Sequence, residues 1–196
     1  MKKWIIPVVV IAVIALWAVN VNNKSVGLDE GVSKAWADVE TSYQRRNDLI
    51  GNLVNTVKGA ADFERNTLTD VIEARSKATQ TTIDPSNVTP EQLQQFNEAQ
   101  GGLSSALSRL LVTVERYPEL KANQNFLKLQ DELTSTENTI QTARVRFNEA
   151  VRPYNLYVRS FPTKLVAGAL GFDEKPYFDS EAGADKPVDV EFDFSN

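Results

Sequence analysis

The chain has 196 residues, a net charge of −5 at pH 7, and neither cysteine nor histidine. This composition excludes disulfides, thiol catalysis, cysteine-bound zinc and a Ser-His-Asp triad, and it removes the commonest metal ligand and general base. The length allows one domain of ordinary size with terminal segments, and we expect no enzyme, no cofactor and no metal site.

The negative charge is concentrated at the carboxyl end. Residues 172–196 hold eight acidic residues and two lysines, a local charge of −6, so the rest of the chain carries +1. This near-neutral body has no basic run with interleaved aromatic residues, and we therefore expect no nucleic-acid partner.

An apolar run near the amino terminus predicts a membrane span. Among the 18 residues from Trp4 to Val21 only Asn20 is polar. As a helix this run reaches about 27 Å, close to the roughly 30 Å of hydrocarbon in a bilayer. We predict a short segment over residues 1–4 and a transmembrane helix over residues 5–21, with the lipid bilayer as its partner.

Flanking residues indicate how this run is processed and oriented. A cleavable signal peptide is the alternative to an anchor, but bulky Leu16 and Trp17 follow the small residues that a cleavage site requires, which favours the anchor. Lys2 and Lys3 outweigh the lone Lys24, so the positive-inside tendency places the amino terminus in the cytoplasm. We predict a single-pass protein of the bacterial cytoplasmic membrane with its body on the extracytoplasmic, periplasmic side.

Residues 28–78 contain no proline and show helical periodicity. Their apolar face is broader than a two-stranded seam, so we expect one long or slightly broken helix that contacts two or more neighbours. Gly51 and Gly59 each weaken a helix by about 1 kcal/mol relative to alanine, and we favour close packing over a hinge as their reason. Two apolar series recur every seven residues: Val32, Val39, Leu53 and Ala60, and Trp36, Tyr43, Ile50 and Val57.

A strong start signal follows a polar connector. Thr89, Pro90 and Gln92 form a capping box with proline at the first helical position. The signal predicts a helix over residues 90–117 that ends before Pro118.

The longest periodic stretch covers residues 123–161, with Asn123 as its expected cap. Steps of three and four indicate a helix packed lengthwise against partners, and about 36 residues make a rod of roughly 54 Å. Pro153 should bend or break it, and we favour a helix end followed by another helical piece over a functional kink. The seam residues are Phe126, Leu129, Leu133, Thr136, Ile140, Ala143, Phe147, Ala150, Tyr154, Val158 and Phe161.

The last predicted helix is short. Ser160, Pro162 and Gly171 bracket residues 163–170 as cap, first helical position and C′ glycine. The elements together predict an all-α fold: an antiparallel up-and-down bundle of long helices over residues 28–172, preceded by one transmembrane helix.

Residues 173–196 form an acidic tail. Apolar and acidic residues alternate over residues 188–194, which is the period of a strand. Because a lone acidic strand has no sheet to join, we predict that the tail is disordered unless a partner or the bundle captures it.

Three blocks of this sequence resemble the LemA family. They are Trp36 to Ala74, with Tyr43 to Val54 inside it; Leu107 to Leu111 with Glu115 to Asn123; and Asn125 to Arg144 with Tyr154 to Phe172. The resemblance covers most of residues 28–172 and implies a short amino-terminal segment, one membrane span and an antiparallel helical bundle. It implies no activity. Gly51 stands where the family pattern has proline, and Phe63 where histidine is common.

One charged residue interrupts a core-facing series. Arg46 falls in the seven-residue series with Val39 and Leu53, so its guanidinium must be paired or must reach outward along its stem. Glu137 and Asn138 are the residues that can meet it across the bundle. We favour a buried polar cluster of Arg46, Glu137 and Asn138 that fixes helix register. A ligand or partner site, and a laterally extended arginine, are the alternatives.

These observations favour a non-enzymatic, membrane-tethered scaffold or adaptor for another, unidentified envelope or membrane protein. One alternative is an envelope enzyme that works through carboxylates, which requires two acids about 5 to 10 Å apart in a groove. The other is a sensor or signalling accessory that transmits ligand binding through the span. We assign no catalytic, cofactor-binding or metal-ligating residue.

Overall fold

A computed structural model describes residues 4–59 and 64–179, and within these residues every regular element is a helix. The all-α bundle with an apolar amino-terminal helix is therefore confirmed. The elements are α1 (Ile5–Lys58), α2 (Arg65–Gln80), the 3-10 turn η2 (Pro85–Asn87), α3 (Pro90–Val114), α4 (Pro118–Lys121), α5 (Gln124–Arg159) and α6 (Thr163–Ala169).

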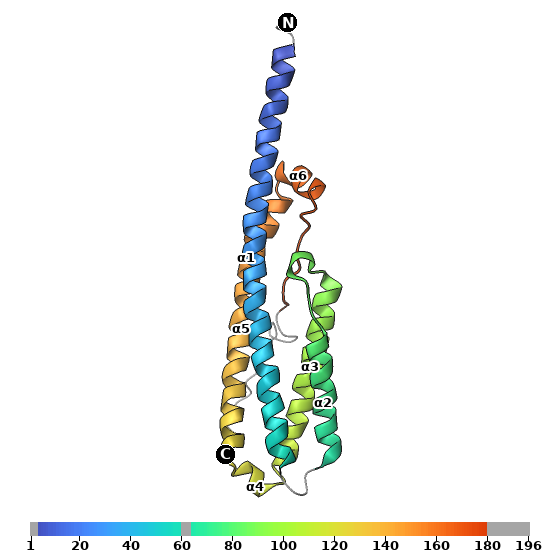
Figure 1. Cartoon of the computed structure of the whole chain (residues 1–196), viewed down its shortest axis with the longest axis vertical. Coiled ribbons are helices and arrows are strands. Elements are labelled where there is room, and N and C mark those ends of the chain that lie inside the picture. The colour runs from blue at the N-terminus through green and yellow to red at the C-terminus, as the bar shows by residue number, and fades with distance from the viewer. Residues whose placement is uncertain (1–3, 60–63, 180–196) are drawn as a thin grey trace, which may run out of the picture.

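The long helix α1 joins the predicted span to the bundle without a break (Figure 1). Its 54 residues make a rod of about 81 Å. The amino-terminal part is long and apolar enough to cross a membrane, and its side chains are exposed as far as Leu16. Packing against the body begins near Val21, which is only 1% exposed.

The prediction of one long or slightly broken helix over residues 28–78 is wrong. The structure ends α1 at Lys58 and begins α2 at Arg65, and α2 runs back along α1. Each helix presents apolar residues at helical spacing to the same core and no proline lies between them, so periodicity alone does not reveal the turn.

The two glycines of this region have different roles. Gly59 is the C-cap of α1, where the helix ends, so it does not serve the close packing that we predicted for it. Gly51 does: a methyl group built at this position would lie 3.2 Å from Cζ of Arg75 on α2.

The body is an up-and-down bundle in which α1 pairs with α5 and α2 pairs with α3 (Figure 1). Its core has two parts. The part nearer the span is rich in aromatic residues from α1, α3 and α5, and the far part is mostly aliphatic. The aromatic part contains Trp36, Tyr43, Phe96, Phe147, Tyr154 and Phe178.

Local capping signals place two helix starts. The side chain of Thr89 accepts from the backbone N–H of Gln92, and both halves of the predicted capping box are present. The side chain of Asn123 accepts from the N–H groups of Asn125 and Phe126, as predicted for the start of α5. These signals succeed because the capping residue and its partners are neighbours in sequence.

Pro153 lies inside α5 and does not end it, so the predicted break is wrong. The proline is on the exposed face, whereas Val151 and Tyr154 on either side of it are buried in the core. Packing on both sides holds the helix together across the one hydrogen bond that proline cannot make.

After α5 the chain makes the predicted short helix and then an extended segment. Gly171 has the positive φ of +82° expected of a C′ glycine. We predicted a disordered acidic tail unless a partner or the bundle captures it, and the bundle does capture residues 173–179, because Lys175 and Phe178 are each only 4% exposed. We call residues 173–179 the tail strap. The alternating residues 188–194 lie outside the described residues.

Candidate functional site

Arg46 is buried in the bundle between α1, α3 and α5. Only 3% of the residue is exposed, although its guanidinium is charged. The heptad position forces it inward, where a charge is stable only with polar partners.

The guanidinium of Arg46 finds partners on two other helices. Its Nη1 donates to Oε1 of Glu137 at 3.1 Å and to the hydroxyl of Ser104 at 3.3 Å. Its Nη2 donates to the side-chain oxygen of Gln100, and the cation lies 4.9 Å from the ring centre of Tyr43. The side chain of Glu137 is 47% exposed, so the ion pair lies at the edge of the core.

The structure brings Arg46 and Glu137 together but leaves Asn138 outside the cluster. Asn138 is exposed on α5, where its backbone carbonyl accepts from the hydroxyl of Thr142 at 2.9 Å. Adjacent residues on a helix point in different directions, so Glu137 and Asn138 cannot both face Arg46.

Sequence reasoning missed Gln100, the most deeply buried partner of Arg46, at 4% exposure. Its amide nitrogen donates to the backbone carbonyl of Ala78 at 3.3 Å, which ties α3 to the end of α2. The signal was present, because Gln100 stands between Phe96 and Leu103 on the apolar seam of α3. A polar residue at such a position predicts a buried hydrogen bond.

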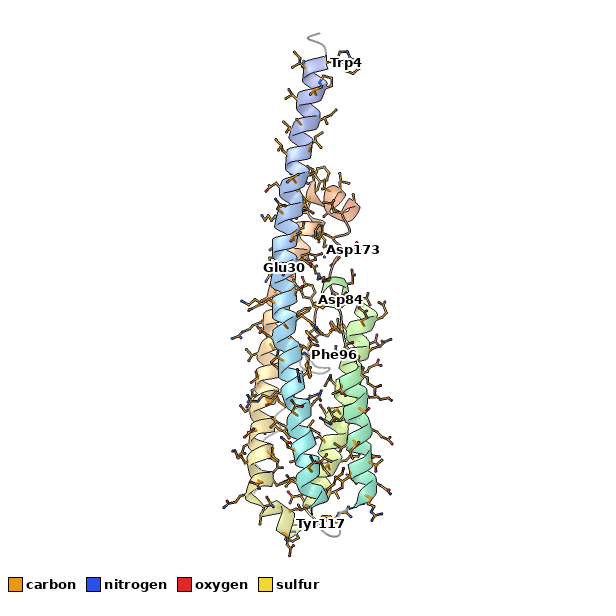
Figure 2. The ribbon with its side chains drawn as sticks, viewed as in Figure 1. Trp4, Glu30, Asp84, Phe96, Tyr117 and Asp173 are labelled. Atoms are coloured by element: carbon orange, nitrogen blue, oxygen red, sulfur yellow. The ribbon has the colours of Figure 1, made fainter. Side chains whose placement is uncertain are left out.

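A second polar cluster surrounds Lys175 of the tail strap. The ammonium lies 2.7 Å from Oδ1 of Asp29 on α1 and donates to the carbonyl oxygens of Pro85 and Ser86 at 2.6 and 3.1 Å. It also lies 5.4 Å from the ring centre of Tyr154. A buried lysine thus links α1, η2 and α5 at the membrane-proximal end of the body, near Asp173 and Asp84 in Figure 2.

Two asparagines of α5 hold the backbone of the tail strap. The side-chain amide of Asn155 accepts from the N–H of Lys175 at 2.9 Å and donates to its C=O at 2.7 Å. Asn148 does the same with Phe178, at 2.8 and 2.9 Å. Each amide therefore closes a two-bond clamp on one residue of an extended chain.

The spacing of these clamps matches the two backbones that they join. Asn148 and Asn155 are seven residues apart on a helix, about 10.5 Å, and Lys175 and Phe178 are three residues apart on an extended chain, about 10 Å. The strap runs antiparallel to α5, because its later residue pairs with the earlier asparagine. The two asparagines thus bind an extended polypeptide through its backbone.

An aromatic pocket receives the side chain of Phe178. The Phe178 ring stacks on Trp36 with centroids 5.9 Å apart and meets the edge of Phe147 at 5.3 Å. Arg144 covers its other side at 4.7 Å. We call the surface formed by Trp36, Phe147, Asn148, Asn155 and Asp29 the strap groove.

Removing one clamp should release the strap locally. We expect Asn155→Ala to speed hydrogen exchange at the Lys175 amide by about tenfold or more, because two hydrogen bonds worth about 1 kcal/mol each are lost. Residue-resolved exchange of the full chain in detergent micelles measures this. Asn138→Ala, an exposed asparagine on the same helix, is the control, and equal exchange at Lys175 in both variants would refute the clamp.

The tyrosine beside the Lys175 cluster makes stability depend on pH in the alkaline range. Burial, and then the charges of Asp29 and Asp173, raise the pKa of Tyr154 to about 12. Its hydroxyl donates to the carbonyl of Asp173 at 2.8 Å. Because the folded state holds this proton more tightly than the unfolded chain, the stabilisation is complete below about pH 10 and is lost as the pH rises towards 12.

The variant Tyr154→Phe isolates this effect. As the pH rises from about 10 to 12, the free energy of unfolding of the wild type should fall by about 2 kcal/mol relative to the variant. Denaturant unfolding of both proteins across this range is the measurement. Parallel pH curves would show that Tyr154 ionises as freely in the folded state as in the unfolded one.

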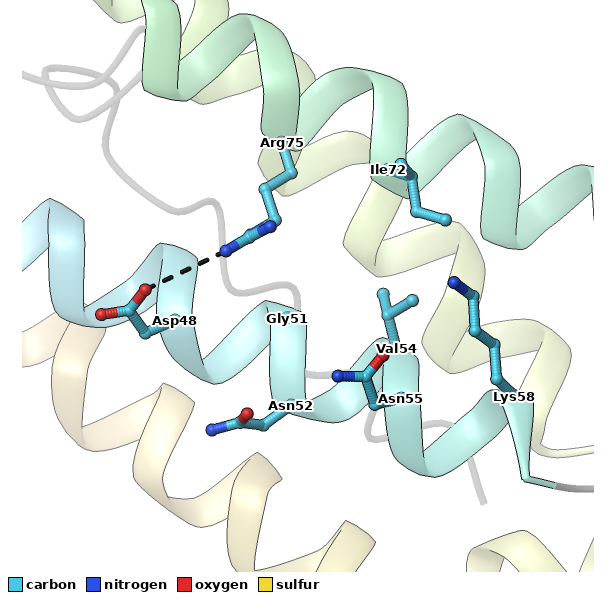
Figure 3. Close-up of a pocket in the computed structure, with 8 residues that line it drawn as sticks. All are labelled: Asp48, Gly51, Asn52, Val54, Asn55, Lys58, Ile72 and Arg75. Carbon is cyan, nitrogen blue, oxygen red and sulfur yellow. Dashed lines mark ion pairs between the residues drawn. The ribbon is translucent and has the colours of Figure 1, made fainter.

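A shallow polar pocket lies on the far half of the body between α1 and α2 (Figure 3). Arg75 crosses it, donating from Nε to the carbonyl of Asn47 at 2.8 Å and lying 4.0 Å from the carboxylate of Asp48. Both charged side chains are substantially exposed, and the guanidinium covers Gly51. This arrangement joins α1 and α2 at a solvent-exposed surface.

Comparison with known proteins gives a consistent picture. The LemA family matches residues 35–192. The chain is 26% identical over 183 residues to Magnetosome protein MamQ 2 of Paramagnetospirillum magneticum, covering 85% of this chain and 67% of the relative. It is 25% identical over 183 residues to Magnetosome protein MamQ of Magnetospirillum gryphiswaldense, with the same coverage. Protein LemA of Metamycoplasma hominis is 25% identical over 161 residues, covering 82% of this chain and 68% of that protein.

Proposed function

The chain belongs to the LemA family, and we propose that it acts as a membrane-anchored, non-enzymatic scaffold or adaptor for another envelope or membrane protein. The observation that carries this proposal is the strap groove, which already holds a polypeptide in extended form.

The strap groove has both a general and a selective part. The amides of Asn148 and Asn155 bond to backbone groups, so they accept any extended segment irrespective of its side chains. Selectivity comes from Asp29, which pairs with a lysine, and from the aromatic pocket around Trp36, which takes a phenylalanine. A partner segment with lysine and, three residues later, an aromatic residue fits both.

The chain's own strap competes with such a partner. Because the strap is covalently attached, it acts at an effective concentration of the order of millimolar, and a partner sees only the fraction of molecules with an open groove. Weakening the strap should therefore strengthen binding in trans. This relation provides the test.

We expect the full-length double variant Lys175→Ala, Phe178→Ala in lipid nanodiscs to bind a labelled peptide, Asp-Glu-Lys-Pro-Tyr-Phe-Asp, at least about tenfold more tightly than the wild type does. A tenfold gain corresponds to about 1.4 kcal/mol of weakened docking of the strap. Fluorescence anisotropy measures the binding, and circular dichroism verifies that the variant is folded.

The control peptide carries alanine in place of both lysine and phenylalanine. It retains the backbone that the asparagines bind but lacks both anchors, so its binding should be weak to either protein. If the folded double variant binds both peptides equally, or neither, the groove does not select polypeptide segments and the adaptor role loses its support.

We further propose that the body is on the extracytoplasmic side of the cytoplasmic membrane. Lys2 and Lys3 before the span support this orientation through the positive-inside tendency. A reporter enzyme that is active only after export should be active when it is fused after Asn196. A reporter that is active only in the cytoplasm should be inactive at the same position. Activity of the cytoplasm-dependent reporter instead would reverse the orientation.

A further inference from the structure

Three large apolar side chains are exposed together where α5 passes into α6. Phe161, Leu165 and Leu170 are 84%, 68% and 49% exposed. We call them the apolar foot. A single exposed apolar residue such as Val112 needs no explanation, whereas three large apolar side chains exposed within ten residues of one another in sequence call for one.

Contacts along α1 give the level of the apolar foot. The ammonium of Lys24 lies over the ring of Tyr157 on α5, at 4.6 Å from its centre. Since α5 runs antiparallel to α1 and ends at Arg159, two residues after Tyr157, Phe161 follows at the end of α5 that faces the span. The foot therefore extends beyond Lys24 toward the last turn of the apolar run.

The packing of α6 confirms this level. The helix contacts both α1 and α5 and lies beside α1 close to the span (Figure 1). Val21, the last residue of the apolar run, is shielded to 1% exposure although its neighbours toward the amino terminus are exposed. The bundle and the apolar run thus overlap by about one turn, and α6 lies beside the boundary of the span.

We propose that the apolar foot inserts into the interfacial layer of the same bilayer that α1 crosses, with lipid acyl chains as its partner. At this level an exposed phenylalanine and two leucines meet the boundary between head groups and acyl chains, where apolar side chains of surface helices are stable. Lys164, exposed on α6 between them, faces the head groups. The backbone of α6 is helical, so insertion leaves few unpaired polar groups.

A second membrane contact restricts how the body stands on the bilayer. With the span alone, the body tilts and rotates together with α1, because α1 is one unbroken helix. Contact through the apolar foot holds the side of the body that carries α6 against the lipid. The strap groove then lies just above the head groups. This proposal depends on the membrane span and not on the adaptor role.

The chain has no cysteine, so single-cysteine variants of the full-length protein can be labelled at one position each. We propose Leu165→Cys for the foot, Val13→Cys for the span and Val112→Cys for the body, each carrying an environment-sensitive fluorophore in vesicles of phosphatidylcholine and phosphatidylglycerol. Val112 is 71% exposed, which matches Leu165 at 68%.

We expect the labels at positions 165 and 13 to shift to the blue and to lose intensity when the lipids carry a nitroxide on their acyl chains. The label at position 112 should show neither change. If the label at position 165 behaves like that at position 112 while position 13 is quenched, the span holds and the foot is in water. If position 13 is also unquenched, the span itself fails, and the proposal fails with it.

The variant Phe161→Asp, Leu165→Asp gives an independent test, because both side chains are exposed and their loss leaves the core intact. A label at Leu170→Cys should be quenched by acyl-chain nitroxides in the otherwise wild-type protein and lose most of that quenching in the double variant. Unchanged quenching would show that Phe161 and Leu165 do not hold α6 at the lipid, and it would overturn the proposal.

Discussion

Replacing Arg46 with alanine should lower the free energy of unfolding by about 3 kcal/mol. The substitution removes a side chain that is only 3% exposed and leaves the buried oxygen of Gln100 without its donor. An unpaired buried polar group costs about 1 to 3 kcal/mol, and the lost packing adds to this. In a chain of this size the melting temperature should fall by about 6 to 12 °C. Thermal unfolding of the full chain in detergent micelles, followed by circular dichroism, measures the change.

Two further variants identify which partner matters. Glu137→Gln should cost less than about 1 kcal/mol, because that carboxylate is half exposed and water already screens its attraction to Arg46. Arg46→Met combined with Gln100→Leu should recover part of the loss: an apolar pair of similar volume needs no partner, but the carbonyl of Ala78 loses the amide of Gln100 as its donor. If Arg46→Ala melts within about 2 °C of the wild type, the side chain is not part of the core.

Replacing Trp36 with alanine should cost about 3 to 5 kcal/mol. The indole is 2% exposed and contacts Phe96 and Phe147 edge-on, at 5.4 and 5.5 Å, as well as stacking on Phe178. Its removal leaves a cavity shared by α1, α3, α5 and the tail strap. These packed elements cannot all move inward to fill the cavity. The melting temperature should fall by about 6 to 20 °C.

The conservative variant Trp36→Phe separates volume from hydrogen bonding. The indole N–H of Trp36 has no hydrogen-bond partner among the described residues. Phenylalanine removes this buried donor and fills most of the space, so its cost should stay below about 2 kcal/mol. Equal losses for Trp36→Ala and Trp36→Phe would mean that the indole nitrogen, not the ring volume, stabilises the core.

Local sequence chemistry predicted the parts of this fold that depend on neighbouring residues. The seam of α5 and the caps at Thr89 and Asn123 follow from spacing and from side chains that bond within three residues. The reversal after Lys58 was missed because no proline marks it and the apolar residues of both helices have helical spacing. Pro153 was misjudged because tertiary packing, and not local propensity, decides whether a helix survives a proline.

The candidate site was only half visible for a similar reason. Arg46 was conspicuous as a charge in an apolar series, and Glu137 was within reach of it. The tail strap was hidden because its anchors, Lys175 and Phe178, belong to the acidic tail, whereas their partners Asn155 and Asn148 lie 20 and 30 positions earlier on α5. Paired asparagines at a seven-residue spacing on one helix face are the sequence signal that could have revealed it.

The most direct test of the adaptor role is site-specific photo-cross-linking in membranes of the cell that makes this protein. A photoreactive amino acid replaces Val145, which lines the open side of the tail strap with Tyr177, or, as the control, Val112, an equally simple exposed valine at the far end of α3. Irradiation should join position 145, and not position 112, to one defined membrane or envelope protein. Adducts that are absent at position 145, or that are the same at both positions, would contradict a partner at the strap groove.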